Sequence, residues 1–296
     1  MPGLRPAALM RCTFTLVALA AGCASGPDAG HAKVALVIGN SAYEGVPTLG
    51  NPVNDAADMC AALKRLGYTT LCYSNVRNRA EFEAHVAEYS ELLTPRTAAV
   101  FFYSGHGVQA NNASFLIPTQ ADPKAIASDA LKVLYGVDEL FDRLRAKPVR
   151  FQLVILDACR TELFAATPVP RMVGGAPPKP APGMDVARSL AAVPRIANGL
   201  APIHDAPAHT MVLYATASRE AAYDGRGRNG PLTKHVLANI ATRDLPVREF
   251  LQRVTLGVEA ETAAYKLPMT PFVYASFGGE FCFAGCPINI APAPLQ

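Results

Sequence analysis

The sequence predicts an α/β fold with a mostly parallel central sheet and helices on both of its faces. From His31 onward, short apolar runs rich in β-branched and aromatic residues alternate with longer stretches of amphipathic helical pattern. Such alternation is typical of parallel strands joined by crossover helices. Two apolar runs stop abruptly at a reactive side chain, one at His106 and one at Cys159. Because ligands and catalytic groups collect beyond the carboxyl ends of parallel strands, both side chains are expected at one rim of the sheet.

The elements expected before Cys159 follow one another closely. A strand at Val34–Ile38 precedes a helix from about Pro52 to Leu66, whose first turns carry Asp55 and Asp58. The later elements are a strand at Thr69–Tyr73, a helix at about Arg79–Leu93, a strand at Ala98–Tyr103 leading to His106, a hairpin through Ala113–Ile117, a helix around Val137–Ala146, and a strand at Phe151–Leu156 leading to Asp157 and Cys159.

A stretch at about 165–208 interrupts this pattern. It is rich in proline, glycine and alanine, a composition that does not build core elements. We therefore expect one domain in two parts, 33–164 and 209–296, joined by the linker 165–208. The elements expected in the second part are a strand at Met211–Ala215, helices at Pro231–Ile240 and Pro246–Ala264, and a strand at Phe272–Ser276.

His106 and Cys159 together indicate a catalytic site. A lone cysteine after an apolar strand is usually an inert buried thiol, and a lone histidine at a strand end is usually structural. Here glycines flank His106, where a bulky neighbour would block approach, and the acidic Asp157 interrupts the strand just before Cys159. A thiol paired with an imidazole is readily activated, because the thiolate is accessible near neutral pH. The conjunction favours Cys159 as nucleophile and His106 as base.

The motifs around these residues resemble the caspase-like cysteine peptidases of family C14, nearest to bacterial metacaspase-type members. The motifs are Tyr-Ser-Gly-His-Gly at 103–107 and Asp-Ala-Cys-Arg at 157–160, and 53 residues separate the histidine from the cysteine, against about 50 in caspases. The resemblance covers roughly residues 33–280, since Val34–Asn40, Asn54–Ala56, Tyr214–Ala217 and Arg228–Thr233 also match. It implies a caspase-like sandwich, with 33–164 as the large, p20-type part and 209–296 as the small part of one catalytic domain.

The resemblance also implies a substrate preference. Caspases proper have glutamine where this chain has Asp157 and glycine where it has Thr161. In metacaspase-type members, an aspartate two residues before the cysteine and another in an early loop select arginine or lysine, and Asp157 and Asp55 match these positions. A carboxylate pair attracts a guanidinium or ammonium group and repels an acidic side chain. The alternative is that Asp157 is a buried structural acid and Asp55 a helix N-terminal cap.

The implied activity is that of a cysteine endopeptidase whose polypeptide substrate has a basic residue at the cleavage position. Cys159 would form a thioester acyl-enzyme, His106 would move the protons, and the backbone N–H groups of Gly107 and Cys159 would hold the oxyanion. This chemistry requires no cofactor and no metal, and the sequence shows neither an EF-hand loop nor zinc-ligand spacing. Basic residues in the linker, Arg171, Lys179, Arg188 and Arg195, would suit self-cleavage; a passive linker is the alternative.

Residues 1–22 are expected to be a secretory signal peptide. Two arginines precede an apolar run, Cys12–Ala21, which is too short to span a bilayer comfortably. The small residues before Cys23 resemble a bacterial lipoprotein cleavage site, which would leave Cys23 lipidated and 23–32 as a linker. Ala24 would then favour sorting to the outer membrane. We expect a periplasmic, lipid-anchored protein of the bacterial cell envelope; ordinary signal-peptide cleavage is the alternative.

Cysteine usage fits an oxidising compartment. Apart from Cys12, Cys23 and Cys159, the sequence has an even number of cysteines, which suggests two disulfides. Short-range pairing would join Cys60 to Cys72 and Cys282 to Cys286. Non-local pairing and free buried thiols are the alternatives.

Composition and charge argue against a nucleic-acid-binding function. Half of the residues are hydrophobic, the net charge is only +3, and no basic run is present, so no nucleic-acid partner is expected. Two other functions stay open: a non-catalytic caspase-fold scaffold or receptor that binds basic peptides at the envelope, and a different thiol enzyme such as a cell-wall amidase or transpeptidase. The intact dyad argues against the first, and the acidic pair argues against the second. The oligomeric state is left open.

Overall fold

A computed structural model describes residues 32–110, 113–159, 196–198, 200, 206–216, 227–265 and 268–286. The expected signal peptide 1–22, Cys23 and most of the linker 165–208, including its four candidate self-cleavage residues, lie outside these ranges. Within them, no helix has both the length and the apolar character needed to cross a membrane.

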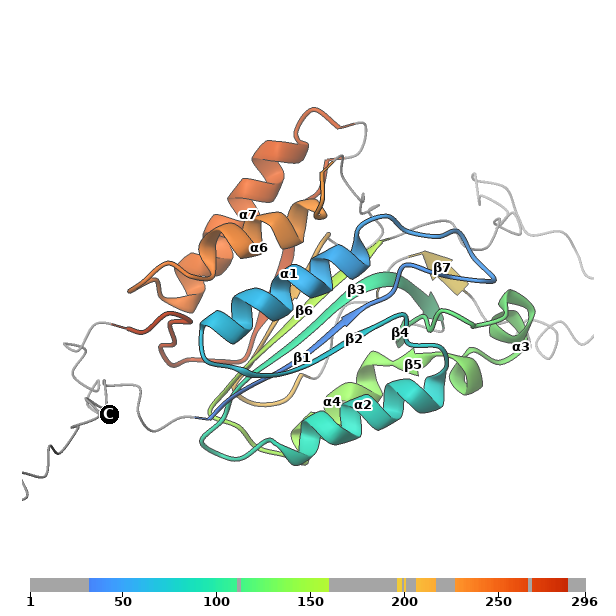
Figure 1. Cartoon of the computed structure of the whole chain (residues 1–296), viewed down its shortest axis with the longest axis horizontal. Helices are drawn as coiled ribbons and strands as arrows, with labels where there is room; N and C mark the ends of the chain where they lie inside the picture. The colour runs from blue at the N-terminus through green and yellow to red at the C-terminus, as the bar shows by residue number, and fades with distance from the viewer. Residues whose placement is uncertain are drawn as a thin grey trace, which may run out of the picture.

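A mostly parallel sheet forms the centre of the molecule (Figure 1). Its main path has the order β2-β1-β3-β6-β8-β9. The five strands from β2 to β8 run parallel, and β9 runs antiparallel to β8 at the edge. The predicted α/β class is therefore confirmed. The strands on this path are β1 (Lys33–Gly39), β2 (Thr69–Ser74), β3 (Ala98–Ala110), β6 (Phe151–Cys159), β8 (Thr210–Tyr214) and β9 (Phe272–Ala275).

Helices cover both faces of the sheet, and each face has its own apolar core (Figure 1). One face is covered by α1 (Pro52–Arg65), α6 (Pro231–Asn239) and α7 (Val247–Thr262), and the other by α2 (Arg79–Glu91) and α4 (Val137–Arg145). Helix α1 buries Ala56, Met59 and Leu63, a spacing that gives a helix one apolar side. Burial on both faces explains why the central strands read as nearly continuous apolar runs.

Strand β3 continues beyond the parallel sheet and supports a smaller extension. After His106 it pairs antiparallel with β4 (Ala113–Leu116) and with β7 (Ile196–Asn198), and β4 pairs with β5 (Tyr135–Gly136). The predicted hairpin through Ala113–Ile117 is therefore present. Helix α3 (Pro123–Val133), which the sequence reading did not include, follows it.

The segment read as a structureless linker contains ordered residues. Ile196–Asn198 forms β7, and the side chain of Leu200 is buried in the same core cluster as α2 and α4. The expectation that the composition of 165–208 builds no core element is wrong at this end. A strand of three residues is too short to change the average composition of a proline-rich stretch. It forms because the edge of β3 offers backbone groups with which it pairs.

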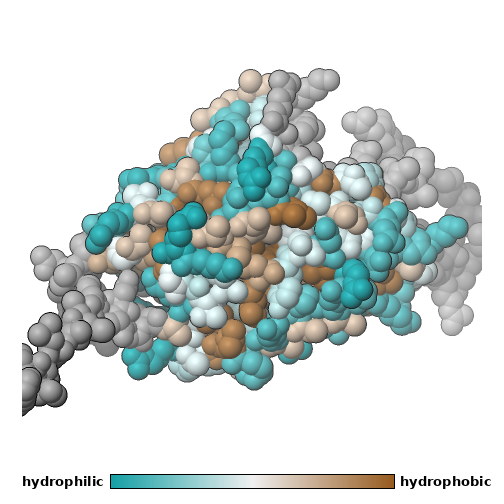
Figure 2. All heavy atoms as spheres, viewed as in Figure 1, coloured by the Kyte–Doolittle hydropathy of each residue, from teal (hydrophilic) through white to brown (hydrophobic). Residues whose placement is uncertain are grey.

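The molecule mixes polar and apolar side chains on its surface. On the face seen in Figure 2, hydrophilic and hydrophobic residues are interspersed. Four large hydrophobic side chains are exposed among the described residues: Leu92, Leu131, Leu256 and Phe272. Single exposed hydrophobic side chains of this kind are ordinary on the surface of a folded domain.

Two disulfide bonds join the cysteines expected to pair at short range. Cys60 on α1 is bonded to Cys72 on β2, and Cys282 is bonded to Cys286 near the end of the described chain. The first bond links α1, the helix that carries Asp55 and Asp58, to the edge strand β2.

Removing the Cys60–Cys72 bond by serine substitution at both positions is expected to destabilise the fold. The bond closes a separation of 12 residues, for which the lost loop entropy of the unfolded chain corresponds to about 3 kcal/mol. The Cys282–Cys286 bond closes only 4 residues and its loss should cost about 2 kcal/mol. Urea unfolding of the two double variants measures both values; a larger loss from the Cys282–Cys286 pair would contradict the loop-length argument.

Candidate active site

The ends of β3 and β6 bring His106 and Cys159 together. The two strands are parallel neighbours, and their register pairs Ser104 with Asp157 and His106 with Cys159. Cys159 is the last residue of β6. His106 and Cys159 therefore form the last pair of the parallel ladder, at the carboxyl rim of the parallel sheet, where the sequence predicted them.

A backbone carbonyl orients the imidazole of His106. Its Nε2 lies 2.7 Å from the carbonyl oxygen of Pro47, in the loop between β1 and α1, and the side chain is fully buried. Because a carbonyl oxygen only accepts hydrogen bonds, Nε2 carries the proton of the neutral ring and Nδ1 carries the lone pair. The contact therefore selects the tautomer whose Nδ1 can accept a proton.

Two tyrosine hydroxyls hold the backbone of His106. Its N–H donates to Tyr43 Oη, and Tyr103 Oη donates to its carbonyl oxygen, each at 2.8 Å. The two hydroxyl oxygens are 3.3 Å apart, and the Tyr43 ring lies against the imidazole with centroids separated by 4.5 Å. A Cβ on Gly105 would lie 2.6 Å from Tyr43 Oη and 2.7 Å from Tyr103 Oη. Glycine is needed before the histidine because these hydroxyls approach the backbone closely. The sequence alone suggests open access to His106 as the reason for this glycine, and the structure gives this other reason.

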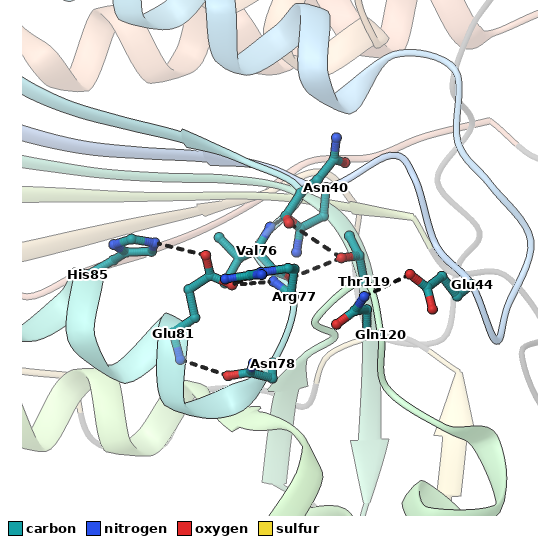
Figure 3. Close-up of polar contacts among 10 residues, drawn as sticks. Asn40, Glu44, Val76, Arg77, Asn78, Glu81, His85, Thr119 and Gln120 are labelled. Atoms are coloured by element: carbon teal, nitrogen blue, oxygen red, sulfur yellow. Dashed lines mark hydrogen bonds and ion pairs between the residues drawn. The ribbon is translucent and has the colours of Figure 1, made fainter.

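Hydrogen bonds anchor the loop that carries Tyr43 and Pro47 to the segment after β2 and to the segment after β4 (Figure 3). Asn40, at its start, accepts from the N–H of Val76 at 2.9 Å and donates to the carbonyl of Ile117 at 3.1 Å. Further along, the N–H of Glu44 donates to the carbonyl of Thr119 at 2.9 Å, and Gln120 Nε2 donates to the Glu44 carboxylate at 2.8 Å. The position of the His106 ring is thus set by a network that reaches from β1 to the segments after β2 and β4.

Gly107, expected to supply an oxyanion donor, continues β3 beyond the histidine. It pairs with Leu116 of β4 in the antiparallel extension. The expected role of its N–H group, and that of Cys159, stays a prediction.

The carboxylates of Asp55 and Asp157 converge on one glycine. A Cβ placed on Gly230 would lie 3.4 Å from Asp157 Oδ2 and 3.5 Å from Asp55 Oδ2. Both aspartates are buried, with 2% and 6% of their surface exposed. They come from α1 and β6, and α6 begins immediately after Gly230. The structure therefore brings together the two acids that the sequence singled out.

Neutral groups hold Asp55. Its Oδ1 accepts from Asn229 Nδ2 and from the N–H of Gly230, both at 3.1 Å, and its Oδ2 accepts from Ser104 Oγ at 3.0 Å. The alternative that Asp55 caps α1 is wrong, because Asn51 is the N-cap and Asp55 is the fourth residue of the helix. The side chain instead faces the end of β3 and the start of α6.

Asp157 is held from α6. Its Oδ2 accepts from Thr233 Oγ1 at 2.7 Å and from the N–H of Thr233 at 3.3 Å. Thr233 is itself fully buried. A hydroxyl and a backbone amide of α6 thus fix the position of this carboxylate.

Burial and mutual repulsion make this pair hard to ionise fully. Loss of hydration, with the charge of the neighbouring Asp157 adding to it, raises the pKa of Asp55 from 3.8 to about 7, although the hydrogen bonds from Asn229, Gly230 and Ser104 act in the opposite direction. An opposite charge placed beside the two carboxylates would favour their ionised form.

Several residues of the site were not singled out from the sequence: Tyr43, Pro47, Ser104, Asn229 and Thr233. Tyr43 and Pro47 lie in a loop without periodic pattern, about 60 residues before the histidine that they contact. Ser104 and the segment around Asn229 did fall within motifs that carried the family resemblance, and this was the available signal.

Comparison with known proteins agrees with this architecture. The family model described as Caspase domain, Peptidase_C14, matches residues 32–279. The human mucosa-associated lymphoid tissue lymphoma translocation protein 1 is 27% identical over 128 residues, which cover 43% of this chain and 15% of that protein. Its homolog from Mus musculus matches to the same extent. The aligned part of the chain thus spans only 15% of the length of these relatives.

A solved structure shares the fold. The structure of pro-sf-caspase-1 matches with a TM-score of 0.54 and 11% identity, covering 88% of this chain and 92% of that one. Since the caspase-domain match runs through both parts of the sheet, from residue 32 to residue 279, the chain belongs to the caspase domain family of cysteine peptidases.

Proposed function

We propose that this protein is an endopeptidase that cleaves polypeptides after arginine or lysine. The observation that carries the proposal is the buried pair Asp55 and Asp157, which neutral donors hold beside the ends of β3 and β6. A guanidinium or ammonium group between two carboxylates relieves their repulsion and gains charge-assisted hydrogen bonds. An acidic side chain would add a third negative charge.

The proposed dyad works through the tautomer that Pro47 selects. His106 Nδ1 accepts the proton of the Cys159 thiol, and the thiolate attacks the scissile carbonyl carbon. The imidazolium then gives its proton to the leaving amine as the C–N bond breaks, which leaves a thioester. Water, deprotonated by His106, attacks the thioester carbonyl and releases the acid product and the Cys159 thiolate. The carbonyl of Pro47 accepts from Nε2 throughout and stabilises the imidazolium.

The backbone N–H groups of Gly107 and Cys159 are the proposed oxyanion donors. Gly107 is the next residue of β3 after His106, and Cys159, the last residue of β6, is the register partner of His106. Loss of one such donor typically costs about 3 kcal/mol of transition-state stabilisation.

We further propose that the protein acts at the bacterial cell envelope, lipid-anchored through Cys23. The sequence of residues 1–23 supports this, and so do the two disulfides, which persist in oxidising compartments. Replacing Cys23 with alanine should release the protein from the membrane fraction, and unchanged fractionation would reject the anchor.

Paired fluorogenic peptides test the proposed activity. The purified chain lacking residues 1–22 is assayed on peptides that end in arginine, lysine or aspartate before the reporter, beside the Cys159→Ala variant. We expect turnover of the arginine and lysine peptides only, and none by the variant. Turnover of the aspartate peptide would reject the role of Asp55 and Asp157. Binding of basic peptides without any cleavage would favour the non-catalytic scaffold.

Replacing Tyr43 with phenylalanine is expected to lower kcat by about tenfold with KM unchanged, because loss of the hydroxyl leaves the buried N–H of His106 unpaired, at a cost of about 1–3 kcal/mol. The phenyl ring keeps the packing against the imidazole. Tyr135→Phe, another buried tyrosine, which stacks on Phe82, is the matched control. A change confined to KM would contradict a role in orienting the histidine.

A further inference from the structure

An ion pair lies beside the acidic site but takes no part in the chemistry proposed above. Arg228 Nε donates to Asp58 Oδ2 at 2.8 Å, and Arg228 Nη2 donates to Asp58 Oδ1 at 3.1 Å. This is the two-pronged arrangement in which arginine binds a carboxylate best. The side chains are 60% and 30% exposed, so the pair sits at the surface.

The pair is connected through Asn229 to Asp55, one of the two buried aspartates. Asp58 follows Asp55 by three residues on α1, which places both carboxylates on the same side of the helix. The amide of Asn229 bridges them, since its Nδ2 donates to Asp55 Oδ1 at 3.1 Å and to Asp58 Oδ2 at 3.0 Å. Arg228 therefore holds its guanidinium next to a buried carboxylate pair that binds that same chemical group in the proposed reaction.

Charge makes the position of Arg228 consequential. Asp58 raises the pKa of Arg228 most, and Asp55 also contributes, so the guanidinium lies within electrostatic reach of the buried site. A cation tethered this close to the site has an effective concentration in the millimolar range. At that concentration it would compete with a peptide that binds weakly. An arginine with no stronger partner nearby would compete with the substrate.

We propose that Asp58 determines access to the acidic site by holding Arg228 away from Asp55 and Asp157. This inference rests on the proposed preference for basic residues. Asp58 offers the guanidinium a two-pronged contact at the surface, where neither group is fully dehydrated, and so keeps the buried carboxylates open for the side chain of a substrate. The chain thus contains its own competing ligand together with the residue that sequesters it.

Three variants test this arrangement with the arginine peptide. In Asp58→Asn, the freed Arg228 occupies the site most of the time, and we expect KM to rise about tenfold with kcat unchanged, as for a binding-competent state reduced to about a tenth. In Arg228→Ala, the competitor is gone and KM should stay at the wild-type value. In the double variant, KM should return to the wild-type value. Asp142→Asn, which removes the exposed Arg145–Asp142 pair on α4, is the matched control, and thermal unfolding verifies that each variant is folded.

Each other result overturns the inference in a distinguishable way. If Asp58→Asn behaves as wild type, Asp58 holds no competitor. If Arg228→Ala raises KM as much as Asp58→Asn does, the pair positions the turn at 228–230 instead. If the double variant keeps the high KM, Asp58 contacts the substrate itself. If the wild-type protein cleaves neither basic peptide, the proposed function fails first and the inference fails with it.

Discussion

Replacing His106 with alanine is expected to lower kcat for cleavage of an arginine peptide by about a thousandfold or more, with little change in KM. The imidazole is the proposed base; it is carried by β3 at the register position of Cys159, and Pro47 and Tyr43 orient it. Neither of these can move a proton to or from Cys159. Steady-state kinetics on the purified variant gives both constants.

The matched control is His85→Ala on α2, whose ring stacks on Tyr73. It should retain wild-type kinetics. Alkylation by iodoacetamide adds a readout specific for the base, because the thiolate reacts and the thiol does not. The pH profile for alkylation of Cys159 should move to higher pH in His106→Ala. A folded His106→Ala protein that keeps a tenth of the wild-type kcat would contradict the dyad.

Strand ends were the part of the site that sequence reasoning placed well. Apolar runs that stop at His106 and at Cys159 mark the place where the parallel pairing of β3 with β6 ends, and parallel topology puts both residues on one rim. The alternation of strands and helices predicted the α/β fold class correctly. Strands β1, β3 and β6 are buried on both faces, and such strands are recognisable in the sequence as apolar runs.

Loops were the part that sequence could not place. Pro47 reaches His106 through a backbone carbonyl, which every residue has, so its identity carried no signal. Asn229 reaches Asp55 across 174 residues, and only the assembled sheet brings α6 to α1. Short elements also escaped: β7 was hidden in a proline-rich stretch, and α3 contains a residue with non-helical backbone, Asp129, that breaks its period.

Replacing Asp55 with asparagine is expected to raise KM for basic peptides by about a hundredfold, because the variant leaves a desolvated guanidinium short of one charged partner. Asparagine is close in shape, and Ser104 can turn its hydroxyl to accept from the new amide, while Asn229 and Gly230 still donate to the remaining oxygen. Asp157→Asn should have a similar effect on KM. Glu44→Gln, an exposed acid that pairs with Gln120 in the loop after β1, is the control for a lost carboxylate charge.

The same residue should make binding of basic peptides depend on pH. Burial, with the charge of Asp157 adding to it, raises the pKa of Asp55 to about 7. Below that pH the free protein holds a proton that the cationic side chain must displace, so affinity should fall by about tenfold per pH unit. Calorimetric titration of Cys159→Ala with an arginine peptide isolates this effect from the chemistry. In Asp55→Asn the dependence should vanish, and an unchanged profile there would assign it to another group.

Stability gives a second test with the opposite sign. Because the pKa of Asp55 is higher in the folded chain than its ordinary value of 3.8, the folded state binds more protons between pH 3.8 and about 7, and the free energy of unfolding falls as pH rises through this window. Asp55→Asn removes the ionisation, so the variant should match wild type near pH 4 and be more stable than wild type at pH 8. A purely structural acid, satisfied by its hydrogen bonds, would give a less stable variant at every pH. Loss of binding together with gain of stability at one residue is what a carboxylate held in readiness for a cation requires.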